Sequence, residues 1–143
     1  MELFEKIQAL IDPSLPLCSN LANAAAVLWE MNNINWAGFY IADGDTLYLG
    51  PFQGKPACTK IPFGKGVCGT AAGRRETVVV DDVDLFPGHI ACSAESRSEI
   101  VVPVLKDGKT VAVIDIDAPI LSRFGEKEKA ELEKISALLS HVF

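Results

Sequence analysis

The sequence has few basic residues, two histidines and no long hydrophobic run, and these shortages exclude several classes of protein. Its 13 lysines and arginines are outnumbered by 19 aspartates and glutamates, so the net charge is −6. Nucleic-acid-binding proteins need a basic stripe that displaces phosphate counterions, so we expect no nucleic-acid partner. Apolar runs such as Ile100–Leu105 are far shorter than a membrane span, so we expect no membrane partner either.

The chain also lacks a CxxC pair, and we expect no signal peptide. Its first ten residues are acidic and amphipathic, unlike a secretory signal, so we expect a cytoplasmic protein. Structural disulfides are rare in that compartment, and clustered cysteines there are more often catalytic or metal-binding. A structural zinc site is disfavoured because Cys58, Cys68 and Cys92 are ten and twenty-four residues apart. We therefore expect no bound metal.

Hydrophobic periodicity predicts four helices and six strands. The predicted helices are Glu2–Ile11, Ser19–Met31, Gly66–Gly73 and Phe124–Phe143. The predicted strands are Trp36–Ile41, Thr46–Gly50, Ala57–Ile61, Thr77–Asp81, Ser98–Leu105 and Thr110–Ala118. This order indicates a single α+β domain with a mainly antiparallel sheet. Helices would cover one face of the sheet, and loops or an open pocket would occupy the other.

Three of the four cysteines lie between Ala57 and Glu99. Buried structural thiols are one interpretation, and the preferred one for Cys18, which lies outside this segment. A redox site explains the cluster better, because one thiol can attack a substrate while another resolves the oxidised intermediate.

Two further ideas concern Cys92. A hydrolase dyad with His89 is disfavoured, because residues so close in one loop seldom align as a dyad. If the residues after Cys92 begin a helical turn, their amides together with Arg97 would lower the pKa of its thiol.

Two aspartates alternate with apolar residues near the end of a predicted strand. In that strand Asp115 and Asp117 share one face with Val111 and Val113. If this face meets solvent, they are ordinary surface carboxylates. If it lines a pocket, the pair would bind a primary ammonium group, and crowding would raise the pKa of one carboxyl.

Trp36 and Tyr40 likewise share one face of an earlier predicted strand. Aromatic residues at this spacing either pack in a core or form a wall that contacts a methyl-sulfur group or a cation. The segment Gly64–Gly69 matches GxGxxG, but the surrounding pattern is antiparallel, which disfavours a dinucleotide site. The glycines instead favour a sharp turn into a helix whose free N–H groups attract an anion.

Taken together, these motifs resemble those of the free methionine-(R)-sulfoxide reductases, which are single GAF domains. The matching segments are Trp36–Tyr40, Gly50–Gly54, Gly66–Gly69, His89–Glu99 and Asp115–Asp117. The resemblance covers almost the whole chain, so it implies one GAF domain over residues 1–143. It also implies a six-stranded, mainly antiparallel sheet with helices on one face and an enclosed ligand pocket on the other.

The resemblance further implies reduction of free L-methionine-(R)-sulfoxide, with no bound cofactor and with electrons from the thioredoxin/NADPH system. Carried over by motif, Cys92 is the attacking thiol, Cys58 the main resolving thiol and Cys68 a second thiol in the pocket; Cys68 and Cys92 can exchange roles. The acidic positions are Glu99, Asp115 and Asp117, and the aromatic positions are Trp36 and Tyr40.

The chemistry of the residues agrees with this resemblance. A sulfoxide oxygen is a poor leaving group until it is protonated, and Glu99 is our candidate general acid. The aspartates would hold the substrate ammonium, and Trp36 would pack against the S-methyl group. The main alternative is a non-catalytic GAF domain that senses redox state or a small ligand. The fold is also compatible with a homodimer formed through its helical layer.

Overall fold

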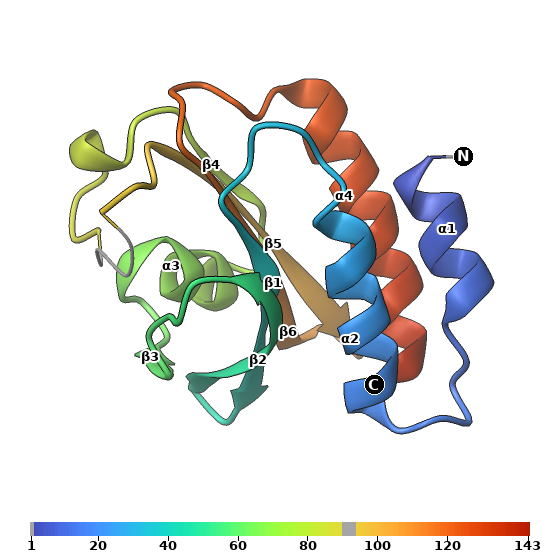
Figure 1. The fold of residues 1–143 in the computed structure, drawn as a ribbon. Coiled ribbons are helices and arrows are strands. Elements are labelled where there is room, and N and C mark those ends of the chain that lie inside the picture. The colour runs from blue at the N-terminus through green and yellow to red at the C-terminus, as the bar shows by residue number, and fades with distance from the viewer. Residues whose placement is uncertain (1, 90–93) are drawn as a thin grey trace.

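The structure is a computed structural model that describes residues 2–89 and 94–143, and a curved antiparallel sheet runs through its centre (Figure 1). Within this part of the chain the α-helices are α1 (Leu3–Leu10), α2 (Leu17–Leu28), α3 (Gly66–Arg74) and α4 (Glu126–Leu139). The strands are β1 (Trp36–Asp43), β2 (Thr46–Gly54), β3 (Lys60–Pro62), β4 (Val78–Val80), β5 (Ser98–Lys106) and β6 (Lys109–Ala118). Two short 3₁₀ helices, η1 (Val83–Leu85) and η2 (Ser140–Val142), complete the described elements.

The strand order is β3-β2-β1-β6-β5-β4, and each neighbouring pair is antiparallel. Strands β5 and β6 join through a two-residue turn, Asp107-Gly108, in which both residues have positive φ angles of 53° and 76°. That left-handed pair matches the right-handed twist of the hairpin. Strands β1 and β6 lie at the centre, so side chains that project from them reach the middle of each sheet face.

Helices α1, α2 and α4 cover one face of the sheet with an apolar core (Figure 1). Strand residues Phe39, Ile114 and Ile116 are fully buried there. The helices contribute Ile7, Leu21, Leu28, Leu132, Ile135 and Leu139, all almost completely excluded from solvent. The amphipathic periodicity of these helices is therefore satisfied by one continuous core.

Helix α3 lies on the opposite face, where it contacts the edge strand β3. Its small residues allow this close packing, because a Cβ atom at Gly69 would lie 2.4 Å from the carbonyl oxygen of Pro62. The predicted α+β fold with an antiparallel sheet is confirmed. The location of α3 differs from the expectation that the helices share one face, since this helix forms part of the pocket side.

Most predicted elements are present, with shifted bounds. Helix α2 begins at Leu17 after Pro16, earlier than the predicted Ser19. The predicted strand Ala57–Ile61 is reduced to β3. Val111 packs against the helix-side core rather than the pocket face, because an irregularity in the β5–β6 register places it out of alternation. Among the described helices, none has both the length and the apolar character needed to cross a membrane.

Candidate functional site

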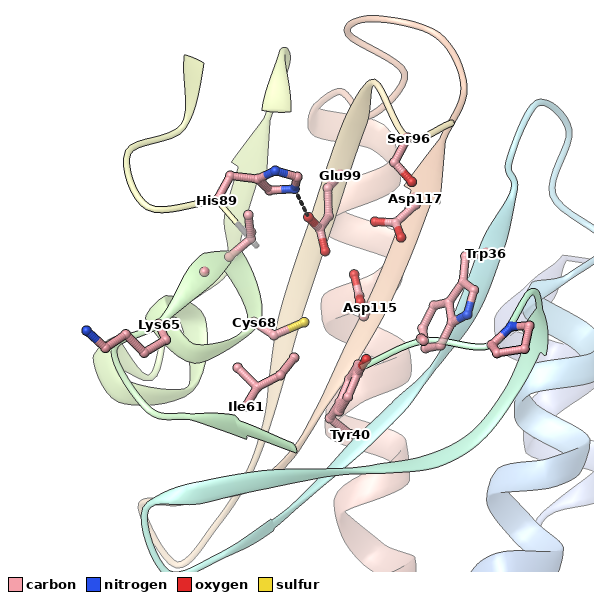
Figure 2. Close-up of a pocket in the computed structure, with 14 residues that line it drawn as sticks. Trp36, Tyr40, Ile61, Lys65, Cys68, His89, Ser96, Glu99, Asp115 and Asp117 are labelled. Atoms are coloured by element: carbon pink, nitrogen blue, oxygen red, sulfur yellow. Dashed lines mark ion pairs between the residues drawn. The ribbon is translucent and has the colours of Figure 1, made fainter. Parts of the chain in front are cut away.

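A cavity lies between the sheet, helix α3 and the segment that follows β2 (Figure 2). We call it the acidic pocket. Its lining residues are Trp36, Tyr40, Pro56, Ala57, Ile61, Lys65, Gly66, Val67, Cys68, His89, Ser96, Glu99, Asp115 and Asp117. They come from β1, β3, β5, β6, the start of α3 and the adjoining loops, so the cavity depends on the folded sheet.

Strand register brings three carboxyl groups together in this pocket. Glu99 on β5 pairs directly with Asp117 on β6, and Asp115 lies two residues earlier on the same face of β6. Glu99 is 6% exposed and Asp115 is 5% exposed. Like charges this close together and this buried are unfavourable unless protons or a cation neutralise them.

The pKa values of these three carboxyls are all raised. Burial raises the pKa of Glu99 and Asp117 well above the usual range, and the nearby charge of Asp115 raises both further. Burial also raises the pKa of Asp115, although interactions with Glu99 and Cys68 partly oppose this shift. Burial and mutual repulsion therefore favour the protonated forms of these carboxyls.

One carboxylate oxygen in the pocket lacks a partner. Within the described residues, Oδ1 of Asp115 is buried and accepts no hydrogen bond. Buried polar atoms are usually satisfied, so an unpaired oxygen that faces a cavity marks a place for a donor from a ligand. Figure 2 shows Asp115 projecting from β6 toward the space between Cys68, Glu99 and Tyr40.

An aromatic wall faces the carboxyls. The Trp36 ring stacks on Tyr40 at a centroid distance of 5.9 Å and on Phe52 at 5.2 Å. Gly38 permits this arrangement, since a Cβ atom there would lie 2.3 Å from Cβ of Phe52. The wall offers an apolar surface beside a strongly polar one.

The polar ends of the two pocket aromatics hold the segment that carries Cys58. Trp36 Nε1 donates a hydrogen bond to the carbonyl oxygen of Lys55 at 3.0 Å. The Tyr40 hydroxyl donates to the carbonyl oxygen of Cys58 at 2.9 Å. Lys55 also forms an ion pair with Glu95, which links this segment to the one that precedes β5.

Cys68 and His89 complete the polar lining. Cys68 lies in the first turn of α3, and its pKa is raised well above the ordinary value by burial and by the charges of Asp115 and Glu99. The Cys68 sulfur and one carboxylate oxygen each of Glu99 and Asp115 all lie within 4.8 Å of one another. His89 Nε2 lies 3.9 Å from Glu99 Oε1, which is the dashed contact in Figure 2.

The other cysteines occupy different surroundings. Cys58 is half-buried against the pocket-side core, and its sulfur takes part in a disulfide. Cys18 is an exposed free thiol, so the preferred interpretation of it as a buried structural thiol is wrong. Cys92 lies outside the described residues, so its predicted attack on substrate and the predicted effect of Arg97 on its pKa stay predictions.

Comparison with known proteins now decides the family. The GAF domain model matches residues 16–142. The free methionine-R-sulfoxide reductase of Saccharomyces cerevisiae is 47% identical over 97% of this chain and 82% of the yeast protein. That of Escherichia coli is 44% identical over 99% of this chain and 86% of its own length. The chain belongs to the free methionine-R-sulfoxide reductase family of GAF domains.

A solved structure supports the same assignment. The free methionine-R-sulfoxide reductase of Neisseria meningitidis, determined in complex with its substrate, superimposes with a TM-score of 0.93 at 45% identity. The alignment covers 99% of this chain and 86% of that protein. The family resemblance stated from the sequence motifs is therefore confirmed.

For this reductase-family chain, the structure brings most of the predicted site residues to one cavity. Those that line it are Trp36, Tyr40, Cys68, Glu99, Asp115 and Asp117. Their individual roles stay predictions. Three polar lining residues, Lys65, His89 and Ser96, were not predicted from the sequence. They lie outside the helices and strands, so hydrophobic periodicity gives no signal for them.

Proposed function

We propose that this protein reduces free L-methionine-(R)-sulfoxide to methionine with its cysteine thiols and without a bound cofactor. The observation that carries the proposal is the convergence of two buried carboxyls, the half-buried Asp117 and an aromatic wall on one cavity beside a thiol. Such a cavity suits a small amino acid that carries an ammonium group at one end and an apolar S-methyl group at the other.

The carboxyls favour the ammonium of a free amino acid. In our proposal Asp115 and Asp117 accept hydrogen bonds from it, and the unpaired Oδ1 of Asp115 offers one acceptor. A cation there relieves the repulsion that now raises the pKa of the carboxyls. A peptide nitrogen carries no charge, so peptide-bound methionine sulfoxide would be rejected. Trp36 would contact the S-methyl group, with Tyr40 beside it.

Glu99 suits the role of general acid. Its raised pKa favours the protonated form, which a donor to the sulfoxide oxygen requires. The Cys92 thiolate then attacks the sulfoxide sulfur, methionine leaves, and the oxygen remains on Cys92 as a sulfenic acid. Cys58 condenses with it to form a disulfide and release water.

Reduced thioredoxin would then reduce this disulfide by dithiol–disulfide exchange and become oxidised itself. NADPH would supply the electrons through thioredoxin reductase. This cycle suits the reducing cytoplasm, where we place the protein. Cys68 serves as a second pocket thiol, with the exchange of roles between Cys68 and Cys92 left open. Because burial and two carboxyls raise its pKa, Cys68 carries little thiolate in the empty pocket, which favours Cys92 as the attacking thiol.

The test is NADPH consumption with thioredoxin, thioredoxin reductase and a limiting amount of racemic free methionine sulfoxide. We expect consumption to stop near half of the added sulfoxide and to be absent with a peptide-bound substrate. The Cys92→Ser variant should show no turnover, and Glu99→Gln should slow the chemical step more than binding. A folded, reduced protein that consumes no NADPH would instead favour the redox or ligand sensor.

A further inference from the structure

We propose that the acidic pocket also binds a thiophilic divalent cation, for which Zn²⁺ is the representative, through Cys68, Glu99 and Asp115. The three side chains come from α3, β5 and β6, so their positions are set by the packing of the sheet and not by one flexible loop. The bound ion would engage Asp115, which the proposed function also assigns to the substrate ammonium, and it would therefore inhibit the reductase competitively.

The geometry is close to that of a zinc site. The candidate ligand atoms all lie within 4.8 Å of one another. Zinc bonds of about 2.0–2.3 Å in a tetrahedron place neighbouring ligand atoms roughly 3.3–3.8 Å apart. Binding requires the carboxyl groups to rotate by the remaining difference. Three protein ligands leave a fourth position for water, as in zinc sites that remain open.

The second argument is the unpaired oxygen of Asp115. Within the described residues, Oδ1 accepts no hydrogen bond although Asp115 is only 5% exposed. In Figure 2 this carboxyl points into the cavity, while the Lys65 side chain extends away from it. The one ion pair that the described residues provide to the three carboxyls is the 3.9 Å contact between His89 and Glu99. Among the described residues, acidic side chains in the pocket therefore outnumber basic ones that face them, and a cation can replace the protons that these carboxyls favour.

The donor set selects the kind of metal. A cysteine thiolate is a soft ligand that Mg²⁺ and Ca²⁺ avoid, whereas zinc accepts thiolate and carboxylate together. Coordination requires the Cys68 thiol and the Glu99 carboxyl to lose their protons to solvent, so binding releases protons and weakens in acid. No oxidation or reduction takes place, since zinc keeps its charge.

Binding is tested on protein in which the Cys58 disulfide is formed and Cys18 is replaced by serine. In that state Cys68 is a free thiol, and no reductant is needed that would itself chelate the ion. Titration of ZnCl₂ against a chromogenic chelator should show one equivalent bound. Cobalt(II) in place of zinc should give a thiolate-to-cobalt charge-transfer band, and MgCl₂ should not compete.

Two variants and one matched control locate the site. Cys68→Ser and Asp115→Asn should each weaken zinc binding by at least about tenfold, and Cys68→Ser should remove the charge-transfer band. Asp45→Asn, at an exposed position in the β1–β2 turn, should bind zinc like the parent protein. No binding by the folded parent protein, or binding and a cobalt band that persist in Cys68→Ser, would overturn the proposal. Should Cys68→Ser not fold, the cobalt spectrum of the parent protein still decides whether a thiolate coordinates.

The inhibitory consequence rests on the proposed function and is measured apart from binding. Pre-reduced Cys18→Ser protein is mixed with free methionine sulfoxide, and methionine is quantified after a single turnover at several substrate and zinc concentrations. Zinc should raise the substrate concentration needed for half-maximal rate and leave the maximal rate unchanged. Activity without zinc tests the reductase proposal alone, so the two ideas fail in different measurements. A lowered maximal rate at saturating substrate would contradict competition for one pocket.

Discussion

The two faces of strand β6 carry opposite kinds of residue, and both faces are buried. On the helix side Ile114 and Ile116 are fully buried in an apolar core. On the pocket side Asp115 is 5% exposed, and Asp117 lies beside it at the same cavity. Successive residues of one strand therefore face either a core that stabilises the fold or a cavity whose charges repel one another.

This alternation separates stability from function along a single strand. Burial of apolar surface on the helix side favours folding, whereas the buried carboxyls oppose it until a cation or protons neutralise them. Because the side-chain period of a strand is two residues, a substitution of Asp115 or Asp117 should affect mainly function, and a substitution of Ile114 or Ile116 should affect mainly stability.

The largest effect is expected from Asp115→Asn. The change removes the charge that we assign to ammonium binding, and loss of one partner from a buried ion pair is worth about 3–5 kcal/mol. We expect kcat/KM for free methionine sulfoxide to fall by about a hundredfold or more, while the unfolding free energy at neutral pH does not fall. Steady-state kinetics and urea unfolding of the same preparation measure both quantities. An unchanged kcat/KM would remove Asp115 from the substrate site.

Ile116→Ala is the matching change on the helix side. It removes buried methyl groups from a closely packed core, so the unfolding free energy should fall by about 2–5 kcal/mol. The kcat/KM of the folded fraction should remain within about twofold of the parent, because the residue faces away from the pocket. Leu85→Ala, at a position 79% exposed, is the control and should cost less than about 0.5 kcal/mol. A large loss of kcat/KM in folded Ile116→Ala would break the separation of the two faces.

The alternation of residue types along the strands was predictable from the sequence, but the surroundings of each strand face were not. Period two placed Asp115 with Asp117, and likewise Trp36 with Tyr40, on the same faces. Whether those faces met solvent depended on α3, which lies over them because Gly69 allows contact with Pro62.

Three other features were equally hidden from sequence periodicity. Glu99 joins the aspartates through the β5–β6 register, which pairs it with Asp117. Val111 deviates from strict alternation because that register is irregular. His89 reaches Glu99 from a loop, and loops carry no periodic signal.

The free energy of unfolding should also depend on pH, because of the carboxyl groups on the pocket side of the sheet. The raised pKa values of Glu99, Asp115 and Asp117 mean that the folded protein binds more protons than the unfolded chain. Their contribution to stability is therefore complete below the ordinary carboxyl pKa of about 4 and is lost as the pH rises through the folded values. Urea unfolding between about pH 4.5 and 7.5 should show this loss, and Asp117→Asn should make it shallower. If the unfolding free energy of Asp117→Asn falls with pH as steeply as that of the parent, Asp117 does not contribute to this pH dependence.

The smallest effect concerns the link between the aromatic wall and the Cys58 segment. Tyr40→Phe keeps the ring but removes the hydroxyl that donates to the Cys58 carbonyl at 2.9 Å, a bond worth about 1 kcal/mol. Because the Cys58 segment becomes less constrained, disulfide formation should slow several-fold, while methionine release in the first turnover stays within about twofold. Rapid-quench assay of methionine, with parallel thiol labelling, separates the two steps. Tyr48→Phe, at a largely exposed position on β2, should change neither rate. If Tyr40→Phe instead slows methionine release alone, the hydroxyl acts on the substrate and does not position Cys58.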